Sequence, residues 1–241
     1  MATIIVFSGQ KGGGGKSISA RATGAELKRW SLQKGAWRVV VVDLDVAQRT
    51  TLEWSEARIA NGIKPDVDVV VVDADEEPDF RIPELSKTYH YIVVDAPGWS
   101  DEITTQLAAV ADLTVLPSGP SIDDLRPTIR LFHELKNAGI PEQRITILLN
   151  RVDTPAEQEL AEEYLKKAGI KPLKAVIRNQ VCYRSAVNVG QAITEVSPEG
   201  PRLAARKAVA EVFKALERAQ KPSSKHSKAP QRFVLKQGET W

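Results

Sequence analysis

The sequence lacks the features that mark several protein classes. Its single cysteine, Cys182, excludes an internal disulfide framework and a metal site built from cysteines alone, which fits a reducing cytoplasm. No stretch approaches the roughly 20 uninterrupted apolar residues that a membrane helix needs. The first ten residues lack the basic start, long apolar segment and cleavage site of a secretory signal. We therefore expect a cytoplasmic protein with no membrane span.

Length and charge predict one domain with a basic end. The chain has 241 residues, of which 42% are apolar, enough for one full-sized core. We expect a single domain over residues 1–220 and a basic, flexible tail over residues 221–241, where serine, lysine and proline are frequent. The formal net charge of +2 is divided unevenly, since residues 201–241 carry +7 and residues 1–200 carry −5. A basic end on an acidic body suggests a polyanionic partner.

Short β-branched runs alternate with segments whose apolar residues lie three or four positions apart. The predicted strands are Thr3–Phe7, Val39–Val42, Val67–Val72, Tyr91–Val94, Leu113–Leu116, Ile145–Leu149 and Leu173–Ile177. The predicted helices are Ser17–Gln33, Asp101–Val110, Ile122–Asn137, Pro155–Ala168 and Arg202–Ala219. This alternation predicts an α/β fold, a mainly parallel sheet with helices on both faces. Ligands bind at the carboxyl ends of such strands, so the loops there are the candidate sites.

A glycine-rich loop, SGQKGGGGKS, follows the first predicted strand and precedes a helix. Its four consecutive glycines can bring backbone N–H groups close to a phosphate, at the positive end of the helix dipole. Lys16 would then reach the β- and γ-phosphates of ATP, and the Ser17 hydroxyl would bind Mg²⁺. The predicted nucleotide-binding residues of the loop are Lys11, Gly12, Gly13, Gly14, Gly15, Lys16 and Ser17. The alternative, a glycine turn whose lysines contact only water, does not explain this order of strand, loop, lysine, hydroxyl and helix.

The loop departs from the standard P-loop because Gln10 stands where the first glycine is usual. From Lys11 to Ser17 it instead resembles the deviant Walker A motif K-G-G-x-x-K-[ST] of the ParA/MinD ATPases. The likeness is greatest to the small ParA-type partition ATPases without an N-terminal helix-turn-helix, since the first strand begins at Thr3. The resemblance implies a P-loop NTPase fold, and a homodimer formed on ATP binding. It also implies that Lys11 and Lys16 are catalytic, with Lys11 reaching the partner's ATP.

Two acidic loops extend the resemblance. Where the family usually reads D-x-D-P-Q, this chain has Asp43 and Asp45, but Val46 and Ala47 replace the proline and move the glutamine to Gln48. The resemblance implies that Asp45 positions or activates the attacking water and that Asp43 supports Mg²⁺. The alternative is a pair of solvated turn carboxylates.

Asp95 ends the fourth predicted strand and is followed by a Pro-Gly turn, the pattern of a Walker B aspartate that binds the Mg²⁺ shell. Asp73 and Asp75 repeat the spacing of the first aspartate pair. We do not expect them to be catalytic, because the family places its pair on the strand after the P-loop helix.

The resemblance also implies a base contact and a dimer contact. Asn150, at the end of the sixth predicted strand, stands where ParA-like proteins contact adenine, and an amide can both donate to and accept from a purine edge. The alternative is a turn-forming asparagine. The segment Pro117–Leu125 is similar to the proline-containing segment of the family's dimer interface, or is a rigid loop before a helix.

Residues Ile177–Val196 are similar to the closing segment of ParA proteins, and a basic helix follows them. Basic side chains there can contact phosphates without reading sequence, which suits binding to bulk DNA. The predicted DNA contacts are Arg184, Arg202, Arg206, Lys207, Lys214 and Arg218. The alternative is a solvated helix face.

The family resemblance implies a cycle of ATP-dependent dimerisation and non-specific DNA binding. Hydrolysis would be slow and stimulated by a ParB-like centromere-binding protein or a cargo adaptor, so that a nucleoid-associated ATPase positions a plasmid, chromosome region or other cargo. The alternative is a MinD-like ATPase of the membrane surface. That class docks through a C-terminal amphipathic helix, whose pattern the tail does not show.

Overall fold

The structure is a computed structural model that describes residues 2–10, 12–35, 37–73, 77–98 and 101–221. These residues form a seven-stranded sheet in the order β3-β2-β4-β1-β5-β6-β7, and all of its strand pairs are parallel. The strands are β1 (Thr3–Phe7), β2 (Val39–Asp43), β3 (Asp68–Val71), β4 (Tyr91–Asp95), β5 (Leu113–Ser118), β6 (Ile145–Val152) and β7 (Ile177–Arg178). The prediction of a parallel α/β fold is confirmed.

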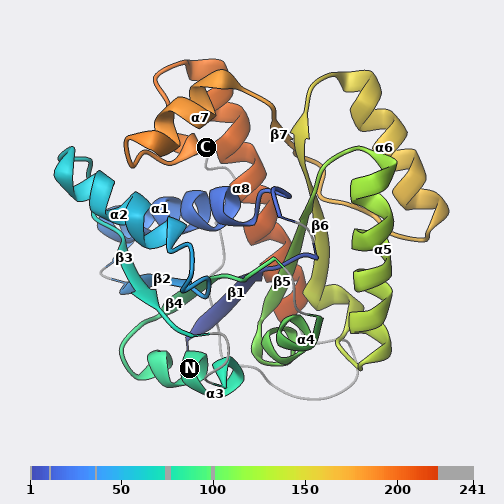
Figure 1. The fold of residues 1–241 in the computed structure, drawn as a ribbon, viewed down its shortest axis with the longest axis horizontal. Helices are drawn as coiled ribbons and strands as arrows, with labels where there is room; N and C mark the ends of the chain where they lie inside the picture. Colours follow the sequence, from blue (N-terminus) through green and yellow to red (C-terminus); the bar gives the residue numbers. More distant parts are fainter. Residues whose placement is uncertain (1, 11, 36, 74–76, 99–100, 222–241) are drawn as a thin grey trace.

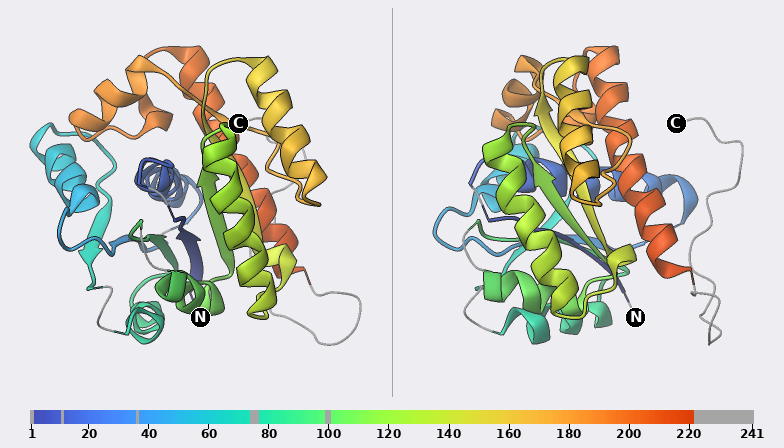
Figure 2. Two further views of the ribbon diagram at one scale, coloured as in Figure 1. Left: turned by 45° about the vertical axis from the view of Figure 1, so that its right-hand side comes forward. Right: turned by 90° about the vertical axis from the view of Figure 1, so that its right-hand side faces the viewer.

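Helices cover both faces of the sheet (Figure 1). They are α1 (Lys16–Lys34), α2 (Thr50–Ala60), α3 (Pro78–Glu84), α4 (Asp101–Val110), α5 (Ile122–Asn137), α6 (Pro155–Lys167), α7 (Val181–Asn188) and α8 (Glu199–Gln220). Short 3-10 turns lie at η1 (Leu85–Lys87), η2 (Glu142–Arg144) and η3 (Ile193–Glu195). The right-hand view of Figure 2 shows α5 and α8 on opposite sides of the sheet. Among the described residues, no helix is long and apolar enough to cross a membrane.

The central strand β1 shows why the sheet is buried on both sides. Ile5 and Phe7 pack into the core beneath α1 and α8, whereas Ile4 and Val6 pack into the core beneath α3 and α4. All four are apolar because alternate residues of a strand point to opposite faces, and both faces are covered. Burying each such side chain contributes about 1.5–3 kcal/mol. The strand is thereby fixed, and its carboxyl end delivers the glycine loop to one edge of the sheet.

Two predicted strands differ from the structure by three residues or more, since β6 continues beyond Leu149 to Val152 and β7 begins later than expected. The run Leu173–Ile177 was expected to pair, but β7 contains only Ile177–Arg178. Leu173 and Val176 are apolar because their side chains fill the core, at 2% and 7% exposure. Burial explains that apolar run, in which the Leu173 backbone also donates to the Ile147 carbonyl of β6 at 2.9 Å.

Candidate nucleotide-binding site

The glycine loop joins β1 to α1 at the carboxyl edge of the sheet, as predicted. Gly13 and Gly15 have φ angles of 78° and 97°, in the left-handed region that favours glycine. A Cβ atom at Gly15 would lie 1.6 Å from the Asn150 side-chain nitrogen. Gly15 is the N-cap of α1 and makes no side-chain capping bond, and the first turn has no acidic residue. The helix therefore presents its N-terminal N–H groups to an anion.

Lys16 lies in the first turn of α1 and is only 8% exposed. Burial lowers the pKa of its ammonium group, while the carboxylates of Asp95 and Asp45 act in the opposite direction. A buried cation is costly unless charge of the opposite sign compensates it. A bound polyphosphate would supply that charge.

A chain of hydrogen bonds converges on Asp95. The Ser17 hydroxyl donates to one Asp95 carboxylate oxygen at 3.1 Å, and the Thr51 hydroxyl donates to the other at 2.7 Å. Arg21 Nε in turn donates to the Thr51 hydroxyl at 2.9 Å. The loop helix α1, the strand β4 and the helix α2 therefore meet at one carboxylate. Sequence reasoning missed Arg21 and Thr51, because neither belongs to a motif.

Burial raises the pKa of Asp95 to about 6. Hydrogen bonds from Thr51 and Ser17 and the charge of Arg21 act to lower it, while the neighbouring Asp43 raises it further. A cation beside this carboxylate would favour its ionised form. The Ser17 hydroxyl and the Asp95 carboxylate are also the hard oxygen ligands that Mg²⁺ takes in phosphate sites. The residues present therefore fit a phosphate-bound Mg²⁺.

The first aspartate pair lies beside Asp95 but makes different contacts. Asp43 is 1% exposed, and its carboxylate accepts backbone hydrogen bonds from Asp45 at 3.1 Å, Thr51 at 2.8 Å and Leu52 at 3.2 Å. It thus holds the first turn of α2, a task that the sequence did not reveal. Asp45 is half-buried and accepts from the Gln48 backbone at 3.0 Å. Their predicted roles toward Mg²⁺ and water stay predictions.

Asn150 lies at the wall of a pocket of about 530 Å³ between the glycine loop and the segment that begins at Ile177. The pocket is lined by Gly13, Gly15, Lys16, Ser17, Ile18, Asn150, Arg151, Ile177, Arg178, Asn179, Gln180, Tyr183 and Arg184. The Asn150 amide donates weakly to the Gly14 carbonyl, at 3.4 Å, and its oxygen accepts from the Arg151 backbone at 2.8 Å. This position beyond the loop is compatible with the predicted adenine contact, which stays a prediction.

The six predicted DNA contacts do not share one environment. Arg184 lines the pocket and donates to the Asn179 side chain at 3.0 Å, so it faces the candidate nucleotide site. Arg202 donates to the carbonyl of Ser197 at 3.0 Å, and Arg206 donates to that of Thr194 at 3.1 Å. Both arginines therefore hold the start of α8 against the segment before it.

The other three predicted DNA contacts, Lys207, Lys214 and Arg218, are exposed along α8. Lys214 also lies 2.9 Å from Glu211. Lys11 lies outside the described residues, as do Asp75 and residues 222–241 of the predicted tail. The segment Pro117–Leu125 contains the end of β5 and the start of α5, where Ser121 is the N-cap and accepts from the Asp124 backbone. Its predicted role in a dimer stays a prediction.

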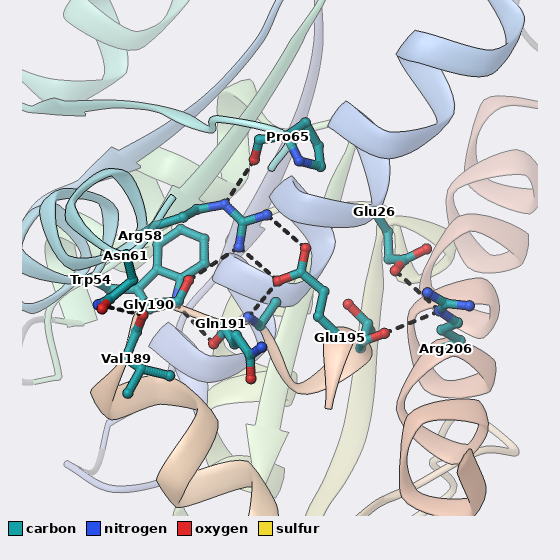
Figure 3. Close-up of polar contacts among 12 residues, drawn as sticks. Glu26, Trp54, Arg58, Asn61, Pro65, Val189, Gly190, Gln191, Glu195 and Arg206 are labelled. Carbon is teal, nitrogen blue, oxygen red and sulfur yellow. Dashed lines mark hydrogen bonds and ion pairs between the residues drawn. The ribbon is translucent and has the colours of Figure 1, made fainter. Parts of the chain in front are cut away.

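A buried ion pair fixes the far half of α2 (Figure 3). Arg58 is 0% exposed and donates to both carboxylate oxygens of Glu195 at 2.6 Å. It also donates to the carbonyls of Pro65 at 2.8 Å and Gly190 at 3.1 Å, and it lies over the Trp54 ring. We call this group the Arg58 joint. It connects α2, whose first turn is held by Asp43, to the segment that follows α7.

The family of the chain follows from a match over the first half of the sequence. Residues 3–127 match the family model described as ATPase MipZ. The chain belongs to the MipZ ATPase family. The predicted ParA/MinD-type relationship is thereby confirmed, and the deviant glycine loop lies within the matched residues.

Solved structures show the same fold as this MipZ-family chain. The cell division ATPase MinD of Pyrococcus furiosus is 21% identical, with a TM-score of 0.69 over 89% of this chain and 99% of that one. A ParA family ATPase from Chlorobium tepidum is 20% identical, with a TM-score of 0.66 over 88% and 98%. A McdA–ATP complex from Cyanothece is 15% identical, with a TM-score of 0.65 over 88% and 96%. A comparison with curated protein sequences gave no significant match.

Proposed function

We propose that this chain binds ATP and Mg²⁺ at the glycine loop and hydrolyses ATP as a ParA-type nucleotide switch. The observation that carries the proposal is the convergence of Ser17 and Thr51 on the buried carboxylate of Asp95, directly beside the buried Lys16 and the open N-terminus of α1. The McdA structure that resembles this chain was determined as an ATP complex, which supports the same ligand here.

Each residue of the site would have a separate role in binding or hydrolysing ATP. The N–H groups of the loop and Lys16 would hold the β- and γ-phosphates, and Ser17 and Asp95 would hold Mg²⁺, with support from Asp43. The metal would neutralise charge on the phosphate oxygens. Asp45 is half-buried beside this group and its carboxylate can orient the attacking water. Lys11, from the resemblance, would reach the ATP of a second copy and make hydrolysis depend on dimerisation.

The ATP-bound homodimer would bind DNA without sequence preference. The exposed Lys207, Lys214 and Arg218 follow one another along α8 and could contact successive phosphates. A ParB-like or cargo adaptor protein would stimulate hydrolysis and release the dimer. The result would be partition of a plasmid or chromosome region, or positioning of another cargo on the nucleoid.

Binding to two surfaces tests this function against the membrane alternative. The protein is mixed with unrelated duplex DNA or with anionic liposomes, each with ATP, ADP or no nucleotide, over a salt series. We expect ATP-dependent DNA binding that weakens steeply with salt, because phosphate contacts release counterions. ATP-dependent binding to liposomes alone would instead support a MinD-like ATPase of the membrane surface. Absence of ATP binding would refute both.

A further inference from the structure

The backbone at Arg151 is irregular in a way that redirects its side chain. Asn150 pairs with Ile177 and Val152 pairs with Arg178. These two pairs are consecutive in β7 but are separated by one residue in β6. Arg151 is the extra residue of this bulge, and its φ angle is 57°, in the left-handed region. Such a conformation is strained for any residue except glycine, and bulges beside active sites commonly re-aim a side chain. The strained backbone at Arg151 therefore suggests that its side chain has a functional role.

The re-aimed side chain lies against the glycine loop. One terminal nitrogen of the Arg151 guanidinium is 3.6 Å from where a Cβ atom of Gly13 would lie. The other is 3.4 Å from the corresponding point at Gly119. Arg151 also lines the pocket together with Lys16 and Ser17. The guanidinium therefore lies between the glycine loop at Gly13, whose N–H group would help to hold phosphates, and the β5–α5 connection at Gly119, where the Asp124 carboxylate is also close.

Within the described residues, the Arg151 guanidinium has no hydrogen bond or ion pair, and the residue is exposed. Arg58 is the contrast, since its guanidinium is buried and donates to four oxygens. A strained arginine at the mouth of a phosphate loop, whose guanidinium makes no hydrogen bond to the described residues, is suited to an anionic ligand. Guanidinium groups bind phosphate oxygens in a bidentate manner, which a lysine cannot do.

We propose that Arg151 binds the phosphate chain of ATP from within the same protomer, as a second cation beside Lys16. The proposal rests on the proposed function, since it names a further residue of that ATP site. Arg151 would raise the affinity for ATP more than that for AMP, because only ATP carries the outer phosphates that lie against the glycine loop. It would act without a second copy of the chain, unlike the lysine at position 11.

Two substitutions test the proposal by equilibrium binding of ATP and AMP, together with thermal unfolding of the nucleotide-free protein. R151Q removes the charge, and R151G removes the charge and relieves the strained φ. We expect each to weaken ATP binding at least tenfold, with AMP binding changed less than threefold. The nucleotide-free R151G protein should unfold at the same or a higher temperature than wild type, because the strain is gone. R130Q, at an exposed arginine of α5, is the matched control and should bind ATP as wild type does.

The outcomes separate this inference from the proposed function. If wild type binds ATP and R151Q binds it equally well, the inference fails and the proposed function stands. Equal losses for ATP and AMP would place the contact on the base, the ribose or the α-phosphate, which both nucleotides carry, and would also overturn the inference that Arg151 binds the outer phosphates. A loss seen only at protein concentrations that support dimers would place Arg151 across an interface, against the proposal. If wild type binds no ATP, the proposed function fails first.

Discussion

The candidate nucleotide pocket and the Arg58 joint each contain an arginine, but the two guanidinium groups lie in opposite surroundings. In the joint, Arg58 is fully buried and every contact is made by the chain itself, through Glu195, Pro65 and Gly190. At the pocket, the open helix terminus and the exposed, strained Arg151 face a cavity. A polar group satisfied by the chain stabilises the fold, whereas one left open at a cavity is available to a ligand.

Helix α2 connects the two regions. Its first turn is held by Asp43 and by the Thr51 bond to Asp95, and its second half is held by Trp54 and Arg58. The segment around Glu195 is in turn contacted by the first turns of α8, where Arg206 donates to the Thr194 carbonyl. Substitutions in the two regions should accordingly affect different properties, binding in one and stability in the other.

The largest expected effect is on ligand binding at the pocket. Lys16→Ala removes the cation that the β- and γ-phosphates require, so ATP binding should fall more than a hundredfold, equivalent to about 3 kcal/mol or more. The free energy of unfolding should change by less than the free energy of ATP binding, because burial of the ammonium opposes its attraction to the Asp95 and Asp45 carboxylates. Calorimetric titration with ATP measures the ATP affinity, and urea unfolding measures the stability. The exposed Lys171 provides a matched control as Lys171→Ala. Unchanged ATP affinity would overturn the assignment of the phosphate site.

A substitution in the Arg58 joint should affect stability rather than ligand binding. Glu195→Ala leaves the buried guanidinium without its carboxylate and should lower the free energy of unfolding by about 3–5 kcal/mol. Glu163→Ala is the control, because its pair with Lys167 at 3.0 Å is exposed and should contribute about 1 kcal/mol or less. Urea unfolding measures both. Similar small losses for the two variants would show that the joint does not stabilise α2 as we infer.

The stability of the nucleotide-free protein, measured over a pH series, tests the raised pKa of Asp95. Because burial raises its pKa from 3.8 to about 6, the folded state binds a proton more tightly than the unfolded state. The nucleotide-free protein should therefore lose stability as pH rises through the window from about 4 to 6, by roughly 3 kcal/mol in total. Asp95→Asn has no such proton to lose, so its urea midpoint relative to wild type should rise across that window. Parallel curves for the two proteins would contradict the raised pKa.

The predicted helix α5 and the unpredicted helix α2 differ in the residues that make up their buried faces. The prediction for α5, Ile122–Asn137, was confirmed at both ends, because Ser121 is a typical N-cap and its buried face consists of leucine and phenylalanine. By contrast, α2 was not predicted, since its buried residues are Thr51, Trp54, Ser55 and Arg58. Those side chains are buried by partners far away in the chain, such as Glu195, which is 137 positions from Arg58.

Prediction of the candidate site from the sequence was limited in the same way, because contacts between distant parts of the chain are not visible in it. The phosphate loop and Asp95 could be predicted because glycine spacing and strand ends are local properties of the sequence, whereas the role of Asn150 was expected from the family resemblance and stays a prediction. Arg151 was missed because a bulge depends on how β6 pairs with β7, and nothing in the residues around it signals the shift. Arg202 and Arg206 were expected at DNA, yet each bonds a carbonyl of the preceding segment, which a count of basic residues cannot reveal.

The smallest expected effect is on DNA binding by α8. Lys207→Glu and Lys214→Glu replace exposed cations that make no contact with the nucleotide pocket, so each should weaken DNA binding several-fold and lower the salt dependence by about one phosphate contact. ATP affinity should be unchanged, because the pocket lies on other elements. Arg206→Glu, in contrast, should also lower stability, since its guanidinium donates to Thr194 and lies 3.5 Å from the buried Glu26. Binding to one duplex over a salt series, with ATP present, compares the three variants. Undiminished DNA affinity in both lysine variants would remove this face of α8 from the interaction.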